Sequence, residues 1–276
     1  MSKSFFPIEC LSDTAYGVAY CRAMETERPD AHFQDIFARE LAGKRGKLIM
    51  ETTGESSSWL FVVRTCIIDK LILESIEKKG IDTVINLGAG LDTRPYRLSL
   101  PSSLHWIDVD LPSILDYKEQ KLASQQPICF LESVKLDVTD ITLSSALFTR
   151  INAEAKQVLV ITEGLLVYLT SEQVALLTII LGIQPNFRWW ILDLVSPLSL
   201  KLARTKYVKE LTAANAIQQF APSEGTDFFQ SYGWKVVKFQ SLLKEAHRLK
   251  RKPALNWLWQ QLPCFKNEGV VLLRRT

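Results

Sequence analysis

The chain has 276 residues and is 47% hydrophobic, which is long for one compact domain, normal for a single α/β unit and ample for a buried core. Its 33 basic and 30 acidic residues give a net charge of +3, so charge does not call for nucleic acid as a partner. No apolar stretch reaches the roughly 20 residues of a membrane-spanning helix, and residues 1–7 lack the apolar core of a signal peptide. We therefore expect a cytoplasmic protein without stable membrane association.

The amino-terminal part is predicted to be helical. Residues 8–43 are expected to form two short helices, and the glycines and threonines of residues 43–54 a flexible joint. Apolar residues at helical spacing then predict an amphipathic helix over residues 56–79 that packs on a sheet. We accordingly divide the chain into a helical lid, residues 1–55, and a main domain, residues 56–276.

The most informative stretch is residues 83–94, where an apolar β-type run ends at a Gly-x-Gly turn. Gly88 and Gly90 permit a sharp bend and close approach of the backbone to a ligand, and residues 92–93 are able to cap a following helix. Arg94 stands where a dinucleotide-binding turn has its third glycine, which disfavours a pyrophosphate cradle. S-Adenosylmethionine (SAM) has no phosphate, and it requires close backbone approach and an acidic partner for its ribose. The alternative is a turn that only closes a strand.

Three further apolar runs, predicted as strands, lead into acidic residues. The runs cover residues 104–110, 133–138 and 157–162, and the acids are Asp110, Asp137 and Glu163. Asp110 follows the glycine turn by about twenty residues, where a ribose presents its hydroxyls, and Asp137 is able to accept from an adenine amino group. Ligands in open parallel sheets bind at the carboxyl edge, so these acids are expected to share one site with the Tyr168 phenol. Taken singly, an acid after a strand more often caps the following helix than binds a ligand, and this is the alternative for each of the three.

The carboxyl third continues the pattern of a doubly wound sheet. Ser171 is expected to cap a helix that ends near residue 181. The remaining expected elements are a fifth strand over residues 188–195, a mainly helical insertion near 198–231, and two strands over 234–239 and 269–274. The predicted fold is thus α/β, with a doubly wound, mostly parallel seven-stranded sheet and an antiparallel end.

Several remaining features leave alternatives open. The basic run 247–252 favours a solvated surface segment over contact with an acidic acceptor or a membrane surface. The tryptophan-rich stretch 254–262 either covers an apolar acceptor or packs in the core. Five cysteines and three histidines show no metal-ligand spacing, so we expect no metal site and reduced thiols.

Taken together, these motifs resemble the leucine carboxyl methyltransferase-like family of SAM-dependent O-methyltransferases, which have the Rossmann-like class I methyltransferase fold. The resemblance rests on ordered blocks at residues 20–31 (YCRAMETERPDA), 64–65 with Asp69, 86–98 (NLGAGLDTRPYRL), 108–112 (DVDLP), Asp137 and 163–169 (EGLLVYL). They run from about residue 16 to 181, and beyond that the likeness is only architectural. Residues 32–36 (HFQDI) depart from the family's FxDP pattern, which puts the start of the second lid helix in question.

The resemblance also implies a site. Arg22 and Arg64 would hold the carboxylate of SAM, and Gly88, Ala89 and Gly90 would line its methionine portion. Asp110 and Leu111 would lie at the ribose, and Asp137 and Val138 at the adenine. Glu163 would lie near the amino end of SAM and the reaction centre, and would serve as a general base if its pKa were raised. For Tyr168 two roles stay open: its phenol orients the acceptor, or its ring packs beneath the following helix.

The predicted function is SAM-dependent methyl transfer to a hydroxyl or carboxylate oxygen of a small organic acceptor. Displacement at a sulfonium carbon mainly requires alignment and exclusion of water, so a strong base is not obligatory. A protein or peptide carboxyl methyltransferase is the nearest alternative. A nicotinamide-dependent oxidoreductase is disfavoured by the missing third glycine, and a non-enzymatic SAM-sensing module is the third alternative. The acceptor and the oligomeric state stay open.

Overall fold

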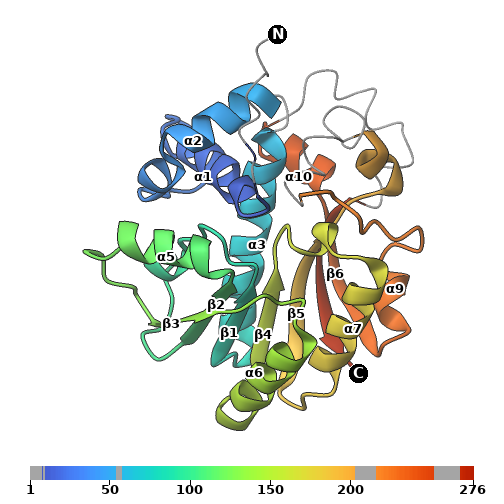
Figure 1. Ribbon diagram of the computed structural model, residues 1–276. Helices are drawn as coiled ribbons and strands as arrows, with labels where there is room; N and C mark the ends of the chain where they lie inside the picture. The colour runs from blue at the N-terminus through green and yellow to red at the C-terminus, as the bar shows by residue number, and fades with distance from the viewer. Residues whose placement is uncertain (1–7, 9, 54–57, 203–215, 252–267) are drawn as a thin grey trace.

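A single seven-stranded sheet forms the centre of the molecule (Figure 1). The computed structural model describes residues 8, 10–53, 58–202, 216–251 and 268–276. The strands are β1 (Thr83–Leu87), β2 (His105–Asp110), β3 (Phe130–Lys135), β4 (Val158–Thr162), β5 (Phe187–Leu194), β6 (Trp234–Ser241) and β7 (Gly269–Arg275). Their order is β3-β2-β1-β4-β5-β7-β6, with β1 to β5 parallel and β7 antiparallel to both β5 and β6. The predicted doubly wound sheet with an antiparallel end is confirmed.

Helices cover both faces of this sheet, and side-chain alternation along the strands divides the core between them. The helices are α1 (Asp13–Thr26), α2 (Ala38–Thr53), α3 (Ser58–Lys79), α4 (Arg94–Arg97), α5 (Pro112–Lys121), α6 (Ile141–Glu154), the 3-10 helix η2 (Leu166–Tyr168), α7 (Ser171–Gly182), α9 (Asp227–Gln230) and α10 (Leu242–Arg248). On β1, Val84 packs with Ile67 of α3, whereas its neighbour Ile85 packs with Phe148 of α6 and Leu177 of α7. The period of two that marks a strand therefore supplies two apolar cores.

The lid consists of α1 and α2 packed against each other. The expected joint over residues 43–54 is largely wrong, because α2 runs through to Thr53 and is interrupted only at Gly43, where φ is 52° and ψ is −159°. Gly46 lies inside the helix, and a side-chain carbon there would collide with the Tyr16 carbonyl of α1. This glycine thus permits close helix packing and does not mark a joint. The division into lid and main domain stays a prediction.

Two other expectations need correction. The third strand is β3, Phe130–Lys135, and not residues 133–138, because Phe130 and Leu131 pair with His105 and Trp106 of β2. In the insertion, residues 197–202 are helical, residues 216–222 form no helix, and α9 is short. The rest of that insertion and the tryptophan-rich stretch 254–262 lie outside the described residues.

The basic run after α10 is only partly a solvated segment. Arg251 is buried, and its guanidinium bonds both carboxylate oxygens of Glu25 on α1 at 2.9 Å and Asp30 at 3.0 Å. His32 adds a contact of 2.7 Å from its ring Nε2 to the Leu249 carbonyl. The chain after α10 is thereby fastened to the lid.

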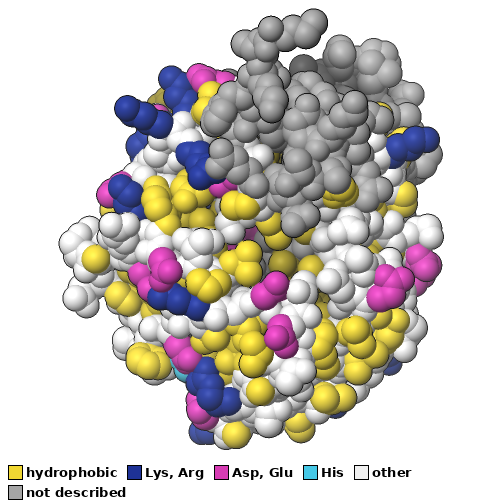
Figure 2. Space-filling model, viewed as in Figure 1, with side chains coloured by type: hydrophobic (Ala, Val, Ile, Leu, Met, Phe, Trp, Pro, Cys, Tyr) yellow, Lys and Arg dark blue, Asp and Glu magenta, His cyan; other side chains and the backbone are white. Residues whose placement is uncertain are grey.

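The surface of the described residues carries charges of both signs. On the face seen in Figure 2, Lys and Arg side chains are interspersed with Asp and Glu between areas of hydrophobic side chains, in keeping with the small net charge. Among the described residues, no helix has the length and apolar character needed to cross a bilayer.

The cap of α7 lies one residue earlier than expected. Thr170 is the N-cap, and its hydroxyl accepts from the Gln173 amide at 3.2 Å while Gln173 Oε1 accepts from the Thr170 amide at 2.8 Å. This reciprocal pair is a capping box. Ser171 is instead the first helical residue.

We therefore expect Thr170→Ala to lower the free energy of unfolding by about 0.5–2 kcal/mol, because the Gln173 amide at the helix start loses the hydroxyl that accepts its hydrogen bond. Ser171→Ala is the matched control and should change it by less than about 0.5 kcal/mol. Urea unfolding of both variants is the measurement. A larger loss for Ser171→Ala would contradict this assignment of the cap.

Candidate functional site

A cavity of about 1120 Å³ opens at the carboxyl edge of the sheet, beneath the lid. It is lined by α1, by α3 and by the loops that follow β1 to β5. The structure brings together in its wall every residue that the sequence predicted for the site, namely Arg22, Arg64, Gly88, Ala89, Gly90, Asp110, Leu111, Asp137, Val138, Glu163 and Tyr168.

The glycine turn after β1 has the left-handed backbone that its sequence predicts. Gly88 has φ 69° and Gly90 has φ 48°, values that residues with a Cβ rarely adopt. A Cβ at Gly90 would lie 3.1 Å from Ala15 of α1, and one at Gly88 would lie 3.1 Å from the Leu165 side chain. The turn is therefore packed between the lid and the loop after β4, with its backbone facing the cavity.

The Asp110 carboxylate is fixed at the end of β2. Its Oδ2 accepts from the Gly90 amide and its Oδ1 from the Leu111 amide, both at 2.7 Å. Burial raises the pKa of this carboxyl in spite of these two amides. Because a carboxylate oxygen has more than one acceptor site, both oxygens are still able to bind a ligand hydroxyl.

Asp137 lies two residues beyond the end of β3 in an exposed turn. Its Oδ1 accepts from the Thr139 amide at 2.9 Å and from the Thr139 hydroxyl at 2.7 Å. Val138 beside it is buried. The turn thus presents an acid and an apolar side chain to the far end of the cavity.

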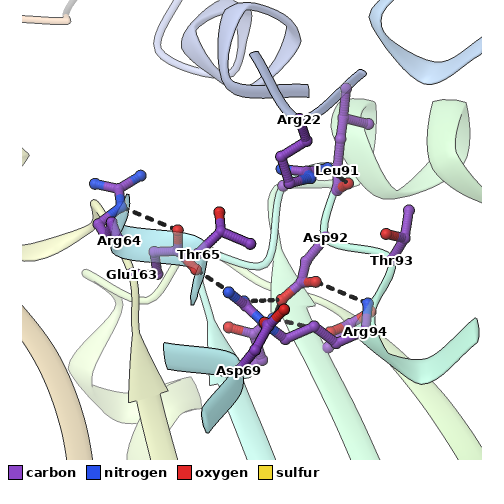
Figure 3. A network of polar contacts seen from close by, with 12 residues as sticks. Arg22, Arg64, Thr65, Asp69, Leu91, Asp92, Thr93, Arg94 and Glu163 are labelled. Atoms are coloured by element: carbon purple, nitrogen blue, oxygen red, sulfur yellow. Dashed lines mark hydrogen bonds and ion pairs between the residues drawn. The ribbon is translucent and has the colours of Figure 1, made fainter. Parts of the chain in front are cut away.

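Arg22 links the lid to the glycine turn. Its Nε donates to Asp35 Oδ2 at 2.8 Å. Its Nη2 donates to the Leu91 carbonyl at 2.5 Å, and Figure 3 shows Arg22 beside Leu91. Asp35 also accepts from the Ala38 amide at 3.1 Å and from the Thr93 hydroxyl at 2.7 Å. Asp35, in the block that departs from the family pattern, therefore bonds the first amide of α2 and joins the lid to the turn.

Glu163 is held between two arginines. Its Oε1 accepts from Arg64 Nε at 2.9 Å and its Oε2 pairs with Arg94 Nη1 at 2.8 Å (Figure 3). Burial alone would raise the pKa of Glu163, but the Arg94 and Arg64 guanidiniums outweigh it and lower that pKa. A lowered pKa makes a poor proton acceptor, so the condition under which Glu163 would serve as a general base is not met.

Arg94 and Asp193 are site residues that the sequence reasoning missed. Arg94 Nε bonds Asp69 of α3 at 2.6 Å, and its Nη1 bonds Asp92 at 2.6 Å, so the residue that replaces the third glycine organises the turn (Figure 3). Asp193, on β5, bonds Arg64 Nη1 at 2.9 Å. The signal for Asp193 was available, because it is an acid close to a fifth strand end.

Tyr168 ends η2 and lines the cavity, where its phenol interacts with the Thr14 side chain of α1 and the Gln218 side chain. Burial raises the pKa of this phenol. Tyr168 is thus a neutral hydroxyl at neutral pH, placed between the lid and the main sheet.

The wall of the cavity is acidic. The described residues that line it include three arginines (Arg22, Arg64, Arg94) and six acids (Asp92, Asp110, Asp137, Glu163, Asp193, Glu268). The excess of carboxylates favours a ligand with positive charge. In the described part of the chain, no group of three His, Cys, Asp or Glu side chains is arranged to hold a metal ion, and Cys10, Cys21, Cys66 and Cys129 form no disulfide bond with one another.

Comparison with known sequences gives two kinds of match. The family model for leucine carboxyl methyltransferase matches residues 15–180. A Streptomyces coelicolor protein, provisionally named an S-adenosyl-L-methionine-dependent methyltransferase, is 33% identical over 183 residues that cover 62% of this chain and 64% of that protein. A Parafrankia protein with the same provisional name is 32% identical over 172 residues, 58% of this chain and 55% of that protein. The matched segment thus spans less than two thirds of the length of either relative.

Comparison with solved structures extends over almost the whole chain. A DUF574 family protein from Streptomyces avermitilis has a TM-score of 0.62 at 13% identity, covering 95% of this chain and 97% of that one. A protein from Thermobifida fusca, provisionally titled a methyltransferase, has a TM-score of 0.63 at 13% identity, covering 98% and 96%. At this identity the likeness shows a shared Rossmann-like fold.

The ion network around Arg94 predicts a large, pH-dependent stability effect. We expect Arg94→Met to lower the free energy of unfolding at pH 7 by about 3–5 kcal/mol, because buried carboxylates lose their cation. The folded-state pKa values of Asp92 and Glu163 are lowered, so their stabilisation is present above the unfolded pKa of about 4 and is lost as pH falls through the folded values. In the variant these pKa values rise, and the difference from wild type should shrink between pH 7 and pH 4.

Urea unfolding across this pH range is the measurement. Arg39→Met removes an arginine whose side chain is 45% exposed and is paired with Glu27, and it is the control that should change little. Equal effects of the two substitutions would show that the Arg94 network does not stabilise the fold.

Proposed function

The chain belongs to the leucine carboxyl methyltransferase family, and from this premise we propose that it transfers the methyl group of SAM to a hydroxyl or carboxylate oxygen of a small organic acceptor. The observation that carries the proposal is the acidic cavity at the carboxyl edge, whose wall contains all the residues that the family motifs implied. The Rossmann-like fold is the class I methyltransferase fold, which supports it.

The site residues fit the chemical groups of SAM one by one. The left-handed backbone at Gly88 and Gly90 leaves no side chain between the turn and a ligand, and Asp110 retains acceptor sites for two ribose hydroxyls. Hydrogen bonds with described residues use Nε and one Nη of Arg22 and of Arg64, which leaves the other Nη of each for the ligand carboxylate. SAM carries one net positive charge at neutral pH, which matches the acidic wall.

The cavity leaves room for a second ligand. Ligand pockets typically measure about 300–1,000 Å³, and the volume of about 1120 Å³ exceeds that range. The part of the wall away from the glycine turn is apolar and includes Trp59, Leu200, Leu242 and Leu243. A small organic acceptor with apolar surface fits this part.

Catalysis in this site would consist of alignment and exclusion of water. Bound SAM would supply a sulfonium methyl group that is already electrophilic. Arg22 fastens the lid to the turn, so the lid covers the cofactor side of the cavity. Tyr168, a neutral hydroxyl, orients the acceptor by donating or accepting a hydrogen bond.

The alternatives receive less support. A peptide carboxylate as acceptor would require a fixed cation. The three arginines of the described wall are all paired with carboxylates, and the remaining Nη of Arg22 and of Arg64 is assigned to the carboxylate of SAM. A nicotinamide cofactor would bring a pyrophosphate to a wall with an excess of acids. Incubation with labelled SAM and a panel of hydroxyl and carboxyl compounds, with NADH in parallel, tests these classes, and binding without turnover to S-adenosylhomocysteine would indicate a sensing module.

A first prediction separates the two acids of β2. Asp110→Ala should weaken binding of S-adenosylhomocysteine at least tenfold, because hydrogen bonds to charged groups contribute about 1.5–3 kcal/mol each. Asp108→Ala should instead lower stability, since Asp108 is buried and pairs with Lys118 at 2.7 Å. Calorimetric titration and circular dichroism of both variants are the measurements. Loss of binding with Asp108→Ala and none with Asp110→Ala would refute the assignment.

A second prediction concerns the arginines. Arg22→Ala and Arg64→Ala should each cost binding of S-adenosylhomocysteine about 1.5–3 kcal/mol and binding of 5′-methylthioadenosine, which lacks the amino-acid end, almost nothing. Arg→Lys should also weaken binding of S-adenosylhomocysteine, because a lysine ammonium lacks the planar guanidinium that bonds its protein partners and the ligand carboxylate at the same time. Equal losses for both ligands would mean that these arginines only hold the lid and the loop after β4 in place.

A further inference from the structure

The cavity extends beyond the proposed cofactor residues to β5 and β7. Asp137, Asp110, the glycine turn and Glu163 follow β3, β2, β1 and β4, which are consecutive in the sheet, so these residues occupy one half of its edge. Because β7 is antiparallel to β5, the beginning of β7 reaches the same edge, and Gly269 pairs with Leu194. Glu268, immediately before β7, therefore lines the other half of the cavity.

Glu268 is a buried acid with serine neighbours. It is 6% exposed, and its Oε1 accepts from the Ser196 amide at 3.2 Å and from the Ser196 hydroxyl at 3.0 Å. Ser199 Oγ is also buried and lies beside Glu268, but it forms no hydrogen bond of standard distance and angle with a described residue. Leu242 and Leu243, each 7% exposed, add apolar surface to the same part of the wall.

Among the described residues, no arginine pairs with Glu268, in contrast to Glu163. Burial raises the pKa of Glu268 in spite of the Ser199 and Ser196 side chains beside it. On β5 and α3, the charged residues that also line the cavity are Asp193 and Arg64, which pair with each other at 2.9 Å. The titratable side chains of the helical residues 197–202 and of α10 are Lys201 and Lys244, Glu245, His247 and Arg248. Of these, Glu245 pairs with Arg248, and Lys201, Lys244 and His247 are exposed.

The other acids of the wall are less suited to take a proton from an acceptor. The pKa of Glu163 is lowered by Arg94 and Arg64. Asp110 accepts hydrogen bonds from two backbone amides on the cofactor half of the cavity, and Asp137 is exposed at the far end of that half. Among the six described acids of the wall, Glu268 alone is buried, forms no ion pair with another described residue and lies beside the apolar part.

We propose that Glu268 is the general base of the reaction and that the acceptor is an uncharged, largely apolar alcohol or phenol whose hydroxyl binds between Glu268 and Ser199. The inference rests on the proposed function and narrows it to a hydroxyl acceptor. As the acceptor oxygen forms its bond to the methyl carbon, the carbon–sulfur bond breaks, sulfur keeps the electron pair, and the hydroxyl proton passes to Glu268. Glu268 then returns this proton to water.

A carboxylate acceptor fits this half of the cavity poorly. It would bring a second negative charge next to Glu268, and two neighbouring carboxylates cannot both ionise without cost. The apolar wall formed by Trp59, Leu242 and Leu243 would also have to desolvate that charge. An uncharged hydroxyl compound avoids both costs.

The test compares wild type with Glu268→Gln, Glu268→Asp and the control Glu245→Gln, which lies on α10 outside the cavity wall. The probes are S-adenosylhomocysteine, for binding by calorimetry, and labelled SAM with neutral alcohols and phenols and their matched acids, such as 2-naphthol and 2-naphthoic acid. We expect all variants to bind S-adenosylhomocysteine as wild type does. For the hydroxyl acceptor, kcat/KM should fall about 10²–10⁴-fold in Glu268→Gln, partly recover in Glu268→Asp and stay unchanged in Glu245→Gln.

The pH profile gives a second readout. In wild type, kcat/KM for the hydroxyl acceptor should rise with pH through the pKa of Glu268, because only the carboxylate accepts a proton, and Glu268→Gln should lose this limb. Should Glu268→Gln fail to fold, a ¹³C-glutamate NMR titration of wild type replaces it. One carboxyl should then titrate above the ordinary value of about 4.3 and shift when 2-naphthol binds to the protein loaded with S-adenosylhomocysteine.

The outcomes separate the two proposals. Wild type that does not bind S-adenosylhomocysteine contradicts the proposed function itself. Wild type that binds it but methylates only the acids, or no compound of the panel, overturns the role of Glu268. Undiminished turnover of the hydroxyl acceptor by Glu268→Gln, or no glutamate that titrates above the ordinary value, overturns it as well.

Discussion

The buried ion network centred on Arg94 is the constraint on which the site depends. Its side chain is 3% exposed and bonds Asp69, Asp92 and Glu163, which belong to α3, the turn after β1 and the loop after β4. Such charges are costly to bury and become tolerable only when each finds its partner, so the three segments must come together in one arrangement. The pKa values of Asp92 and Glu163 are lowered as a result, so these two carboxylates bind a proton less readily. The network therefore fixes the geometry of the turn and also removes Glu163 from acid–base chemistry.

Topology explains why chemistry collects at one edge of this sheet. Parallel strands end at the same edge, so the acids and glycines that follow β1 to β5 converge without being close in sequence. The antiparallel insertion of β7 between β5 and β6 brings the start of one more strand to that edge. The proposed division of the cavity into a polar cofactor half and an apolar acceptor half follows from this order of strands.

The sequence allowed much of the fold to be predicted and part of the site. Alternating and helical apolar patterns located the strands and α3 within a few residues, because burial on one or both faces leaves a strong periodic signal. The role of Arg94 was missed, since an arginine after a glycine turn gives no local sign that three distant carboxylates surround it. Gly46 was misread for a similar reason, because a glycine that admits a neighbouring helix looks in sequence like one that breaks a helix. Asp193 could have been predicted, because it lies near the carboxyl end of the fifth strand, as Asp110 lies at the carboxyl end of the second.

The ion pair between Arg251 and Glu25 of the lid affects the order in which parts of the protein fold during synthesis. Arg251 and Glu25 are 226 residues apart, and β7, formed by residues 269–275, follows the other six strands in sequence but lies inside the sheet. On the ribosome, α1 emerges long before Arg251 and β7, so contacts of such sequence separation form late. The nascent chain is thus able to assemble the strands of the proposed cofactor half early, while the proposed acceptor half and the Arg251–Glu25 contact must wait for residues 251–275. During synthesis the protein would pass through a stage that resembles a cofactor-binding half without a substrate pocket.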